Sequence, residues 1–220
     1  AVSIPVPDMT IHEGPPLFSS HAKLKGEHLI TSGYEALDNA ARNQLGDDLG
    51  RFYAEIHALN TNRMVAAGAQ PVRRWQATAE MRSRALPLLP SALAAQAEET
   101  LDAYERLSPD PHGKVYGFFD GRGWNMAFDK ERQRLCGIYD FADSGIGPLH
   151  EDFIRSNFIS PDLTDRIVDA YEKLTGRVLD RRRIAILTGV HRLSELAELA
   201  DEPEHIPAMI RHVEAWFAPG

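Results

Sequence analysis

The chain has 220 residues, 43% of them hydrophobic, which suits one large domain or two small ones with a sizeable core. Its formal net charge of −8 disfavours nucleic acid as the main partner, because phosphate backbones attract Lys and Arg. No apolar run approaches the roughly 18 residues that a membrane span needs, so we expect a soluble protein with no membrane partner.

The chain contains a single cysteine, Cys136, which excludes an internal disulfide and a cysteine-rich zinc site. The opening residues, AVSIPVP, have neither the basic start nor the long apolar stretch of a signal peptide. Both observations fit a reducing compartment, and we expect a cytoplasmic location.

Prolines oppose a helix in the first 25 residues, where residues 17–24 could form one short strand that leads into a connector. Helical patterning begins at Leu45, from which apolar residues recur at helical spacing as far as Leu59. A second helical stretch is expected over residues 72–107, broken near Pro87 and Pro90.

A turn at residues 108–113 precedes the only stretch that is rich in β signals. Three strands are predicted there, at residues 114–120, 125–129 and 134–141. Three helices are predicted after Pro148, at residues 161–174, 181–199 and 206–217. The predicted fold class is therefore α+β and mostly α, with a small central β-hairpin insert between helical blocks.

Polar side chains stand at the ends of the three predicted strands. Asp120 ends the first strand, Asn125 opens the second after the loop GRGW, and Asp140 lies near the end of the third. A hairpin would bring Asn125 and Asp140 to neighbouring strand ends, with Asp120 in the loop beside them. One charged and one neutral oxygen ligand suit Mg²⁺. A further carboxylate could orient a hydroxyl and accept its proton.

Each of these residues alone also fits an ordinary turn, because Asp and Asn side chains satisfy local backbone groups. The joint pattern is more specific: D-x-x-x-x-N, an apolar strand and then D-F is the spacing of a kinase catalytic loop and metal-binding Asp. The segment from Phe118 to Phe153 resembles the aminoglycoside phosphotransferase and choline kinase family. Members typically carry H-G-D-x-x-x-x-N and then I-D-F-G-D-A-x-x-G-D-P-x-x-D.

This resemblance implies roles for individual residues and a protein-kinase-like C-terminal lobe. Aligned without gaps, Asp120 falls on the catalytic Asp, whereas Asn125 and Asp140 fall on the metal-binding residues. Mg²⁺ and ATP, or GTP, are the implied cofactors. Asp152 falls on an Asp that helps to fix the loop in the family, so we interpret it as structural.

The flanking segments extend the resemblance over nearly the whole chain. PPLFSSHAKLKGEHL resembles the segment between the two kinase lobes, which implies a connector (hinge) at residues 1–26 and a C-terminal lobe with a substrate-facing helical region at residues 27–220. By analogy with the family, the nucleotide base would meet the backbone near Ser20, His21 and Ala22.

LGDDLGRFYAEIHAL resembles a family helix that ends in Leu-His, here Ile56-His57. His57 taken alone is more typical of a packed helix-end histidine than of a catalytic one.

Two features depart from the family pattern. Phe118-Phe119 stands where members carry His-Gly, and a Phe can only pack where the His braces the loop through hydrogen bonds. The N-terminal lobe that covers the nucleotide phosphates is absent from this sequence. We expect that the native protein has this lobe and that these 220 residues alone are inactive. A gene encoding a lone lobe and an accidental resemblance are the alternatives.

The favoured function is a small-molecule phosphotransferase that moves the γ-phosphoryl group of a nucleoside triphosphate to a substrate hydroxyl. The substrate would be an aminoglycoside or another cationic, hydroxyl-bearing molecule. Glu151, Glu195 and Glu198 could help to hold it, although each is also typical of a solvated helix. The alternatives are a non-catalytic kinase-like binding lobe and a metal-dependent phosphoesterase. Nine scattered histidines offer the phosphoesterase no ligand motif.

Overall fold

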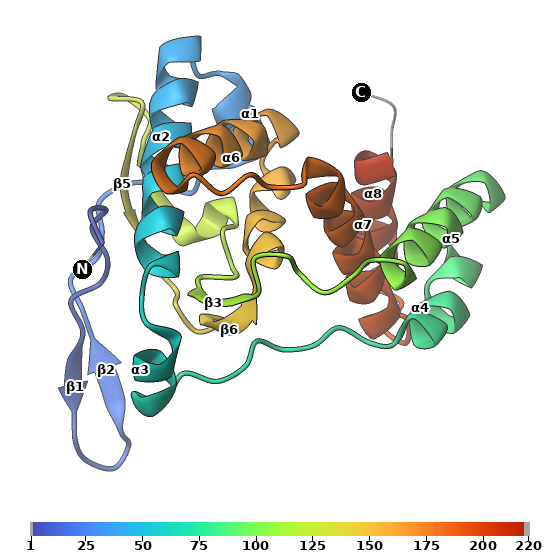
Figure 1. Ribbon diagram of the computed structural model, residues 1–220, viewed down its shortest axis with the longest axis horizontal. Helices are drawn as coiled ribbons and strands as arrows, with labels where there is room; N and C mark the ends of the chain where they lie inside the picture. The colour runs from blue at the N-terminus through green and yellow to red at the C-terminus, as the bar shows by residue number, and fades with distance from the viewer. Residues whose placement is uncertain (1, 218–220) are drawn as a thin grey trace. The chain divides into compact units, whose positions relative to one another are not determined.

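A computed structural model describes residues 2–217, which form two compact units (Figure 1). The first unit contains residues 2–72 and 112–179, and the second contains residues 73–111 and 180–217. Helices predominate in both, which confirms the α+β, mostly α class. The predicted boundary between connector and lobe, after residue 26, lies inside the first unit and stays a prediction.

Within residues 2–72 and 112–179, the first unit has four α-helices, three short 3-10 helices and six strands.

 They are β1 (Thr10–His12), β2 (Phe18–Ser20), α1 (Thr31–Glu35), α2 (Asn39–His57), α3 (Thr61–Ala66), β3 (Lys114–Gly117), η2 (Gly123–Asn125), β4 (Met126–Asp129), β5 (Arg134–Ile138), β6 (Gly145–Pro148), η3 (Leu149–Phe153), η4 (Arg155–Phe158) and α6 (Pro161–Thr175), where η marks a 3-10 helix.

The second unit contains helices and no strand among its described residues. Its elements are α4 (Thr78–Arg84), η1 (Leu86–Leu88), α5 (Ser91–Glu105), α7 (Arg181–Glu198) and α8 (Ile206–Phe217). The predicted break near Pro87 and Pro90 is confirmed, since η1 and a turn separate α4 from α5. None of the helices within residues 2–217 combines the length and the apolarity that a bilayer crossing requires.

Polar caps explain where several helices begin. The side chains of Asp38, Asn60 and Asp180 each accept a hydrogen bond from the backbone amide three residues later, at 2.8, 3.0 and 3.1 Å. Such caps satisfy amides that have no partner inside the helix. They open α2, α3 and α7.

Helices α2 and α6 lie side by side and form the helical core of the first unit (Figure 1). Their backbones approach most closely at two glycines of α2. A Cβ added to Gly46 would lie 2.6 Å from the Cβ of Arg166, and one added to Gly50 would lie 2.6 Å from the Cβ of Ala170. Because no larger residue fits at these positions, the glycines fix the distance between the two helices.

The strands form three two-stranded antiparallel sheets. The predicted hairpin is present as β4 and β5, in which Met126 faces Ile138. The strand predicted at residues 114–120 ends at Gly117 and pairs with β6, a strand that the sequence pattern did not reveal. It stops early because the next two backbone amides turn away from the sheet to a buried carboxylate, which is described below.

Segments from the start of the chain border the β4–β5 hairpin on both sides. Glu27 and Phe128 exchange two backbone hydrogen bonds of 2.9 and 2.8 Å, and the amide of Ile138 donates to the carbonyl of Pro5 at 3.0 Å. The strand expected within residues 17–24 is β2, which pairs with β1. These contacts bring the predicted connector to the strands that carry the polar loops.

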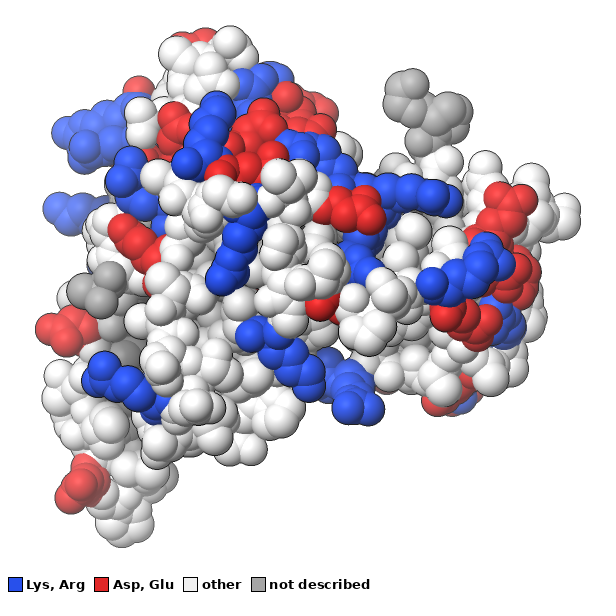
Figure 2. Space-filling view, viewed as in Figure 1, with Lys and Arg blue, Asp and Glu red and all other residues white. Residues whose placement is uncertain are grey.

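The core of the second unit is built from α4, α5, α7 and α8 around Met81, Leu101, Leu193 and Val213, all fully buried. On its surface Arg82 of α4 contacts three acidic residues of α5, Glu98, Asp102 and Glu105, at 2.6–2.8 Å. Figure 2 shows basic and acidic side chains lying next to one another over this region. The network ties α4 to α5.

We predict that Gly50→Ala destabilises the protein by about 2–3 kcal/mol, because the added methyl group would force α2 and α6 apart. Urea unfolding at 25 °C measures the change. Gly33→Ala in α1 is the matched control, since a Cβ there meets only the Cδ1 of Leu29, at an ordinary 3.8 Å. Equal stability of the two variants would contradict the close approach of α2 and α6.

Candidate active site

The loop between β3 and β4 brings two of the predicted site residues into direct contact. The amide nitrogen of Asn125 donates to the carboxylate Oδ2 of Asp120 at 2.6 Å and to its backbone carbonyl at 3.0 Å. Asn125 is buried at the end of η2, whereas Asp120 is half-buried. Both hydrogens of the amide are thus used inside the loop, which leaves Oδ1 of Asn125 as the atom that could ligate a cation.

The second carboxylate oxygen of Asp120, Oδ1, is buried and receives no hydrogen bond from the residues that the structure describes. Two guanidinium groups lie at ion-pair distance from it, with Arg122 Nε at 3.2 Å and Arg155 Nη1 at 3.8 Å. Burial raises the pKa of Asp120 above its usual value, against the opposing effects of Arg122 and Asn125. Nearby Asp143 and Asp140 raise it further.

A fully buried carboxylate, Asp152, holds the start of this loop. Its oxygens accept the backbone amides of Phe118 at 2.8 Å and Phe119 at 2.5 Å. His57 Nε2, at the end of α2, lies 3.0 Å from Asp152 Oδ2, and His57 Nδ1 lies 3.1 Å from the hydroxyl of Tyr171 on α6. The loop that presents Asp120 is therefore fastened to both core helices of the first unit.

The structure also shows how Phe118 and Phe119 occupy the positions where the family carries His-Gly. The ring of Phe118 is buried against Phe141, with centroids 4.9 Å apart, and against Phe52 of α2 at 5.7 Å. Phe118 thus joins the Asp120 loop to the loop after β5 by packing, while Asp152 supplies the hydrogen bonds.

Phe119 adopts a left-handed backbone conformation, with φ of 57°, which a bulky side chain rarely takes. Room for its ring exists because two neighbouring residues are glycines. A Cβ on Gly117 or Gly147 would lie 2.7 or 2.6 Å from ring atoms of Phe119. The turn into Asp120 is therefore fixed by a strained residue whose ring is closely packed.

Asp140 follows β5 and is exposed, with a left-handed φ of 62°. The amide of the preceding residue, Tyr139, donates to the backbone carbonyl of Asn125 at 3.0 Å, so the two loops are joined beside the hairpin. An amide oxygen from Asn125 and a carboxylate from Asp140 are the oxygen donors that Mg²⁺ prefers. The residues present fit such an ion, and their role as ligands stays a prediction.

A cavity of about 620 Å³ lies between the predicted connector and the hairpin. Its lining includes His21 and Lys23 from the predicted connector, Glu27 directly after it, Lys130 from the turn of the hairpin, and Tyr139 just after β5. Of the three connector residues predicted to meet a nucleotide, His21 lines this cavity, whereas Ser20 and Ala22 are exposed beside it in the chain.

The acidic residues suggested for a cationic substrate are engaged elsewhere in their own units. In the second unit, Glu195 pairs with Arg192 at 2.9 Å, and Glu198 pairs with Arg73 at 2.6 Å. Glu151, in the first unit, lies in η3 and is half-buried. Because Glu195 and Glu198 already pair with arginines, their carboxylates are less available to bind a cationic substrate.

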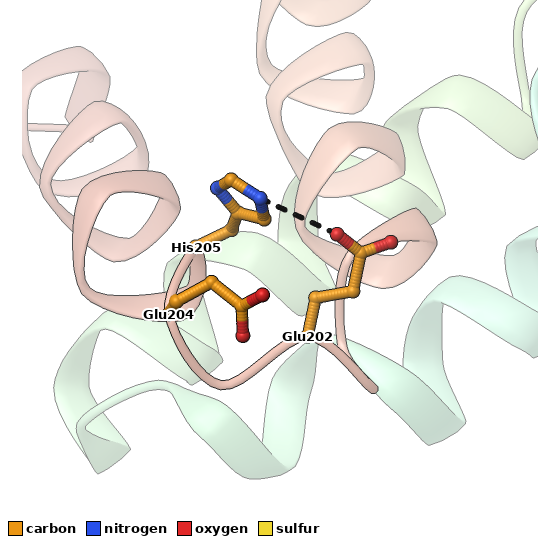
Figure 3. A group of neighbouring side chains, drawn as sticks. All are labelled: Glu202, Glu204 and His205. Carbon is orange, nitrogen blue, oxygen red and sulfur yellow. Dashed lines mark ion pairs between the residues drawn. The ribbon is translucent and has the colours of Figure 1, made fainter.

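One further group of possible metal ligands occurs within residues 2–217, formed by Glu202, Glu204 and His205 before α8 (Figure 3). All three side chains are exposed, and His205 Nε2 lies 3.4 Å from a carboxylate oxygen of Glu202. A surface ion pair accounts for this arrangement. It gives no support to the alternative of a metal-dependent phosphoesterase.

The sequence analysis missed Arg122 and Arg155 as neighbours of Asp120. Arg122 belongs to the same loop, two residues after Asp120. Its positive charge so near in the sequence could have indicated that it contacts the Asp120 carboxylate. Arg155 lies 35 positions beyond Asp120, in a 3-10 helix that no periodicity marked. Only the folded chain shows that both reach the same oxygen.

Comparison with known proteins identifies the family of the chain and solved structures with a similar fold. The family model described as the phosphotransferase enzyme family matches residues 4–216. Among solved structures, the GDP complex of a variant aminoglycoside 2'-phosphotransferase-IIIa is 19% identical, with a TM-score of 0.82 over 98% of this chain and 75% of that one. The macrolide 2'-phosphotransferase MphH from Brachybacterium faecium is 17% identical, with a TM-score of 0.64 over 100% of this chain and 76% of that one. No curated relative matches the chain in sequence.

The fold shared with these structures is that of kinase-like phosphotransferases. The chain itself belongs to the phosphotransferase enzyme family, whose model spans nearly all of it. The resemblance stated from the sequence is thereby confirmed.

We predict that Asp152→Asn lowers the free energy of unfolding by about 2–4 kcal/mol, because an amide NH₂ cannot accept the hydrogen bonds that the buried carboxylate accepts. Urea denaturation with an unchanged slope measures the loss. Asp47→Asn, at an exposed position of α2, is the matched control and should change stability by less than about 0.5 kcal/mol. Equal stability of both variants would refute the bracing role of Asp152.

Proposed function

We propose that this protein is a small-molecule phosphotransferase that transfers the γ-phosphoryl group of a nucleoside triphosphate to a substrate hydroxyl, with Asp120 as the catalytic carboxylate. Membership of the phosphotransferase family supports the reaction type. The single observation that supports the assignment of Asp120 is the unequal hydrogen bonding of its two carboxylate oxygens. Asn125 holds one of its oxygens, and the other is buried without a hydrogen bond. A buried acceptor that has ion-pair neighbours but no hydrogen bond is unusual in a folded protein and is typical of a functional site.

The proposed reaction uses this oxygen as a proton acceptor. The substrate hydroxyl donates its proton to Oδ1 of Asp120 while its oxygen forms a bond to the γ-phosphorus. The bond between that phosphorus and the bridging oxygen breaks, and the nucleoside diphosphate leaves with the electron pair. Burial raises the pKa of Asp120 and makes it a better base than an exposed carboxylate.

Asn125 and Asp140 are proposed to hold Mg²⁺, which when bound would neutralise negative charge on the nucleotide phosphates. Within the chain, the hydrogen bond between Asn125 and Asp120 orients the amide, and the bond from Tyr139 fixes the loop that carries Asp140. The two proposed ligands are thereby positioned beside the catalytic carboxylate before any ligand arrives.

The cavity beside the connector is the proposed place for part of the nucleotide. Lys23 supplies positive charge to its lining, where Lys130 pairs with Glu27 at 2.5 Å. Tyr139, also in the lining, directly precedes Asp140 in the chain. Solved relatives were captured with ATP or with GDP, the product that GTP would leave, so ATP and GTP are the candidate donors. The base is proposed to meet the backbone near Ser20, His21 and Ala22.

The proposed acceptor is a hydroxyl-bearing and cationic small molecule. Solved relatives were captured with kanamycin, gentamicin and streptomycin, and others are named macrolide phosphotransferases. The net charge of −8 is compatible with a cationic acceptor. We further propose that the protein acts in the cytoplasm.

We also propose that the native protein has a further, N-terminal nucleotide-binding lobe. The chain is covered to 98% by the first solved relative but spans only 75% of that relative's length. The β1–β2 hairpin exposes Ile11, Leu17 and Phe18, with 69%, 72% and 54% of their surface accessible. Such neighbouring apolar side chains favour a covering structure.

We predict that Asp120→Asn in the full-length protein lowers phosphoryl transfer on the order of 10³-fold, because Asn keeps the shape of the side chain but accepts no proton. Nucleoside diphosphate release is measured with Mg-ATP and Mg-GTP against kanamycin, gentamicin, streptomycin and a macrolide.

The control for this experiment is Asp129→Asn, at the end of β4, whose carboxylate pairs with Arg132 away from the site. Full activity is expected of it. Unchanged transfer in Asp120→Asn would remove Asp120 from the mechanism, whereas inactivity of the wild-type protein with every acceptor would favour the non-catalytic binding lobe.

We predict that intact-mass spectrometry of the native protein gives a mass above 24.5 kDa. The excess should be on the order of 10 kDa, which corresponds to roughly 100 residues of an additional small domain. A native mass equal to that of the 220-residue chain would reject the N-terminal lobe.

A further inference from the structure

The indole of Trp124 is exposed in the loop that presents Asp120. Trp124 lies in η2, between Gly123 and Asn125, and 52% of its surface is accessible. A 3-10 helix turns by about 120° per residue, so neighbouring side chains point in different directions. Asn125 is buried and contacts Asp120, whereas Trp124 points out of the protein. The turn that buries Asn125 therefore exposes Trp124.

Contacts within the first unit hold Trp124 in place. The amide of Leu29 donates to the carbonyl of Gly123 at 3.0 Å, and a Cβ on Gly123 would collide with the carbonyl oxygen of Leu29. The guanidinium carbon of Arg122 lies 5.0 Å from the ring centroid of Trp124 and 5.1 Å from that of Phe158. Both distances are within the range of cation–π attraction. The indole is thus a fixed apolar surface, with one face against Arg122.

Trp124 lies on the side of Asp120 where the acceptor is proposed to react. Arg122, which covers one face of the indole, has its Nε 3.2 Å from Asp120 Oδ1, the proposed proton acceptor. With one intervening C–N bond of about 1.3 Å, these contacts place the ring centre within about 10 Å of Oδ1. The proposed metal ligand Asn125 contacts Oδ2 instead. The indole and the proposed metal therefore approach Asp120 through different oxygens.

The chemistry of an indole indicates what it binds there. Single exposed apolar side chains are common on protein surfaces, but this one lies beside the proposed reacting oxygen. Small-molecule sites combine aromatic surface with a few placed polar groups. A saturated ring that carries hydroxyl groups, such as a sugar ring, has apolar C–H faces and polar edges. Its face can cover the indole while a hydroxyl of the same molecule reaches Oδ1, at about 2.7 Å.

We propose that Trp124 binds a saturated, hydroxyl-bearing ring of the acceptor and is a specificity-determining residue of the reaction. This inference rests on the proposed function, and it narrows the acceptor to molecules built from sugar-like rings rather than open-chain alcohols. The indole covers the apolar face of the ring, and the reacting hydroxyl lies against Oδ1 of Asp120. Because this contact is the same before and during the transfer, it contributes to the affinity for the acceptor and not to the chemical step.

The first test replaces Trp124 by Ala in the full-length protein and measures transfer from Mg-ATP and Mg-GTP to kanamycin, streptomycin and a macrolide. We expect the KM for a ring-containing acceptor to rise on the order of 10-fold, because the apolar surface that binds it is lost. The kcat and the KM for the nucleotide should stay within about 3-fold of the wild type, since Asp120 and Asn125 are unchanged. A role limited to holding the loop would lower kcat instead.

Val65→Ala is the matched control, because Val65 of α3 is an apolar side chain of nearly equal exposure, 53%, outside the proposed site. All its kinetic constants should equal those of the wild type. Trp124→Phe keeps an aromatic face, so its KM for the acceptor should rise by less than about 3-fold. If Trp124→Ala does not fold, Trp124→Leu replaces it. Leu keeps apolar volume without a flat ring, so that KM should rise by about 5-fold.

A second test observes the indole directly and needs no turnover. The 220 residues contain three tryptophans, so the difference in fluorescence between the wild type and Trp124→Phe isolates the signal of Trp124. Iodide should quench this signal in the ligand-free protein, and a bound ring-containing acceptor should protect it. Shielding from iodide without any acceptor would mean that another part of the native protein covers the indole, and would overturn the inference.

The two tests separate this inference from the proposed function. If Asp120→Asn is inactive while Trp124→Ala keeps the wild-type KM for every ring-containing acceptor, the proposed function stands and the inference alone fails. Transfer to choline, an open-chain alcohol, and to none of the ring compounds would overturn the proposed acceptor class. A ring compound that protects Trp124 but is not phosphorylated would support the binding site and reject the proposed function. Neither transfer to nor binding of any ring compound would overturn both.

Discussion

The site depends on one buried carboxylate that must find hydrogen-bond donors. Asp152 has no contact with water, and leaving its charge unpaired in the interior would be costly. Its donors are two backbone amides that open the loop of Asp120 and the ring of His57 at the end of α2. With its proton on Nε2, His57 can donate to Asp152 and accept from Tyr171. The position of the Asp120 loop is in this way tied to the α2–α6 pair.

Much of this architecture could be predicted from local signals. Helices α6, α7 and α8 follow apolar periodicity, and the break between α4 and α5 follows from Pro87 and Pro90. The sequence pattern predicts that Asp120 and Asn125 lie close together, and they share a hydrogen bond. The prediction holds because both residues belong to one short loop, where the distance along the chain limits the distance in space. The hairpin between β4 and β5 then places Asp140 near them, as its sequence pattern indicates.

Other features depend on contacts between distant parts of the chain. Strand β6 reads GIGP, which carries no strand pattern, and it forms because β3 lies beside it. Short helices such as α1 and α3 have too few residues for a periodic signal. The approach of Arg155 to Asp120 depends on how η4 packs, and the stacking of Arg122 on Phe158 depends on the same element. These are tertiary effects, which local propensity does not record.

The packing of Phe119 has a consequence for how this sequence can vary over evolution. Its ring occupies the space that side chains at Gly117 and Gly147 would need, and its left-handed backbone is the conformation that glycine adopts most easily. A glycine at position 119 would relieve the backbone and empty that space. Position 117 would still be closed to larger residues by the Oδ2 of Asp152, and position 147 by the Cγ2 of Val72 at 2.6 Å. The glycines of β3 and β6 are therefore constrained by several neighbours at once, and a change at position 119 alone would not release them.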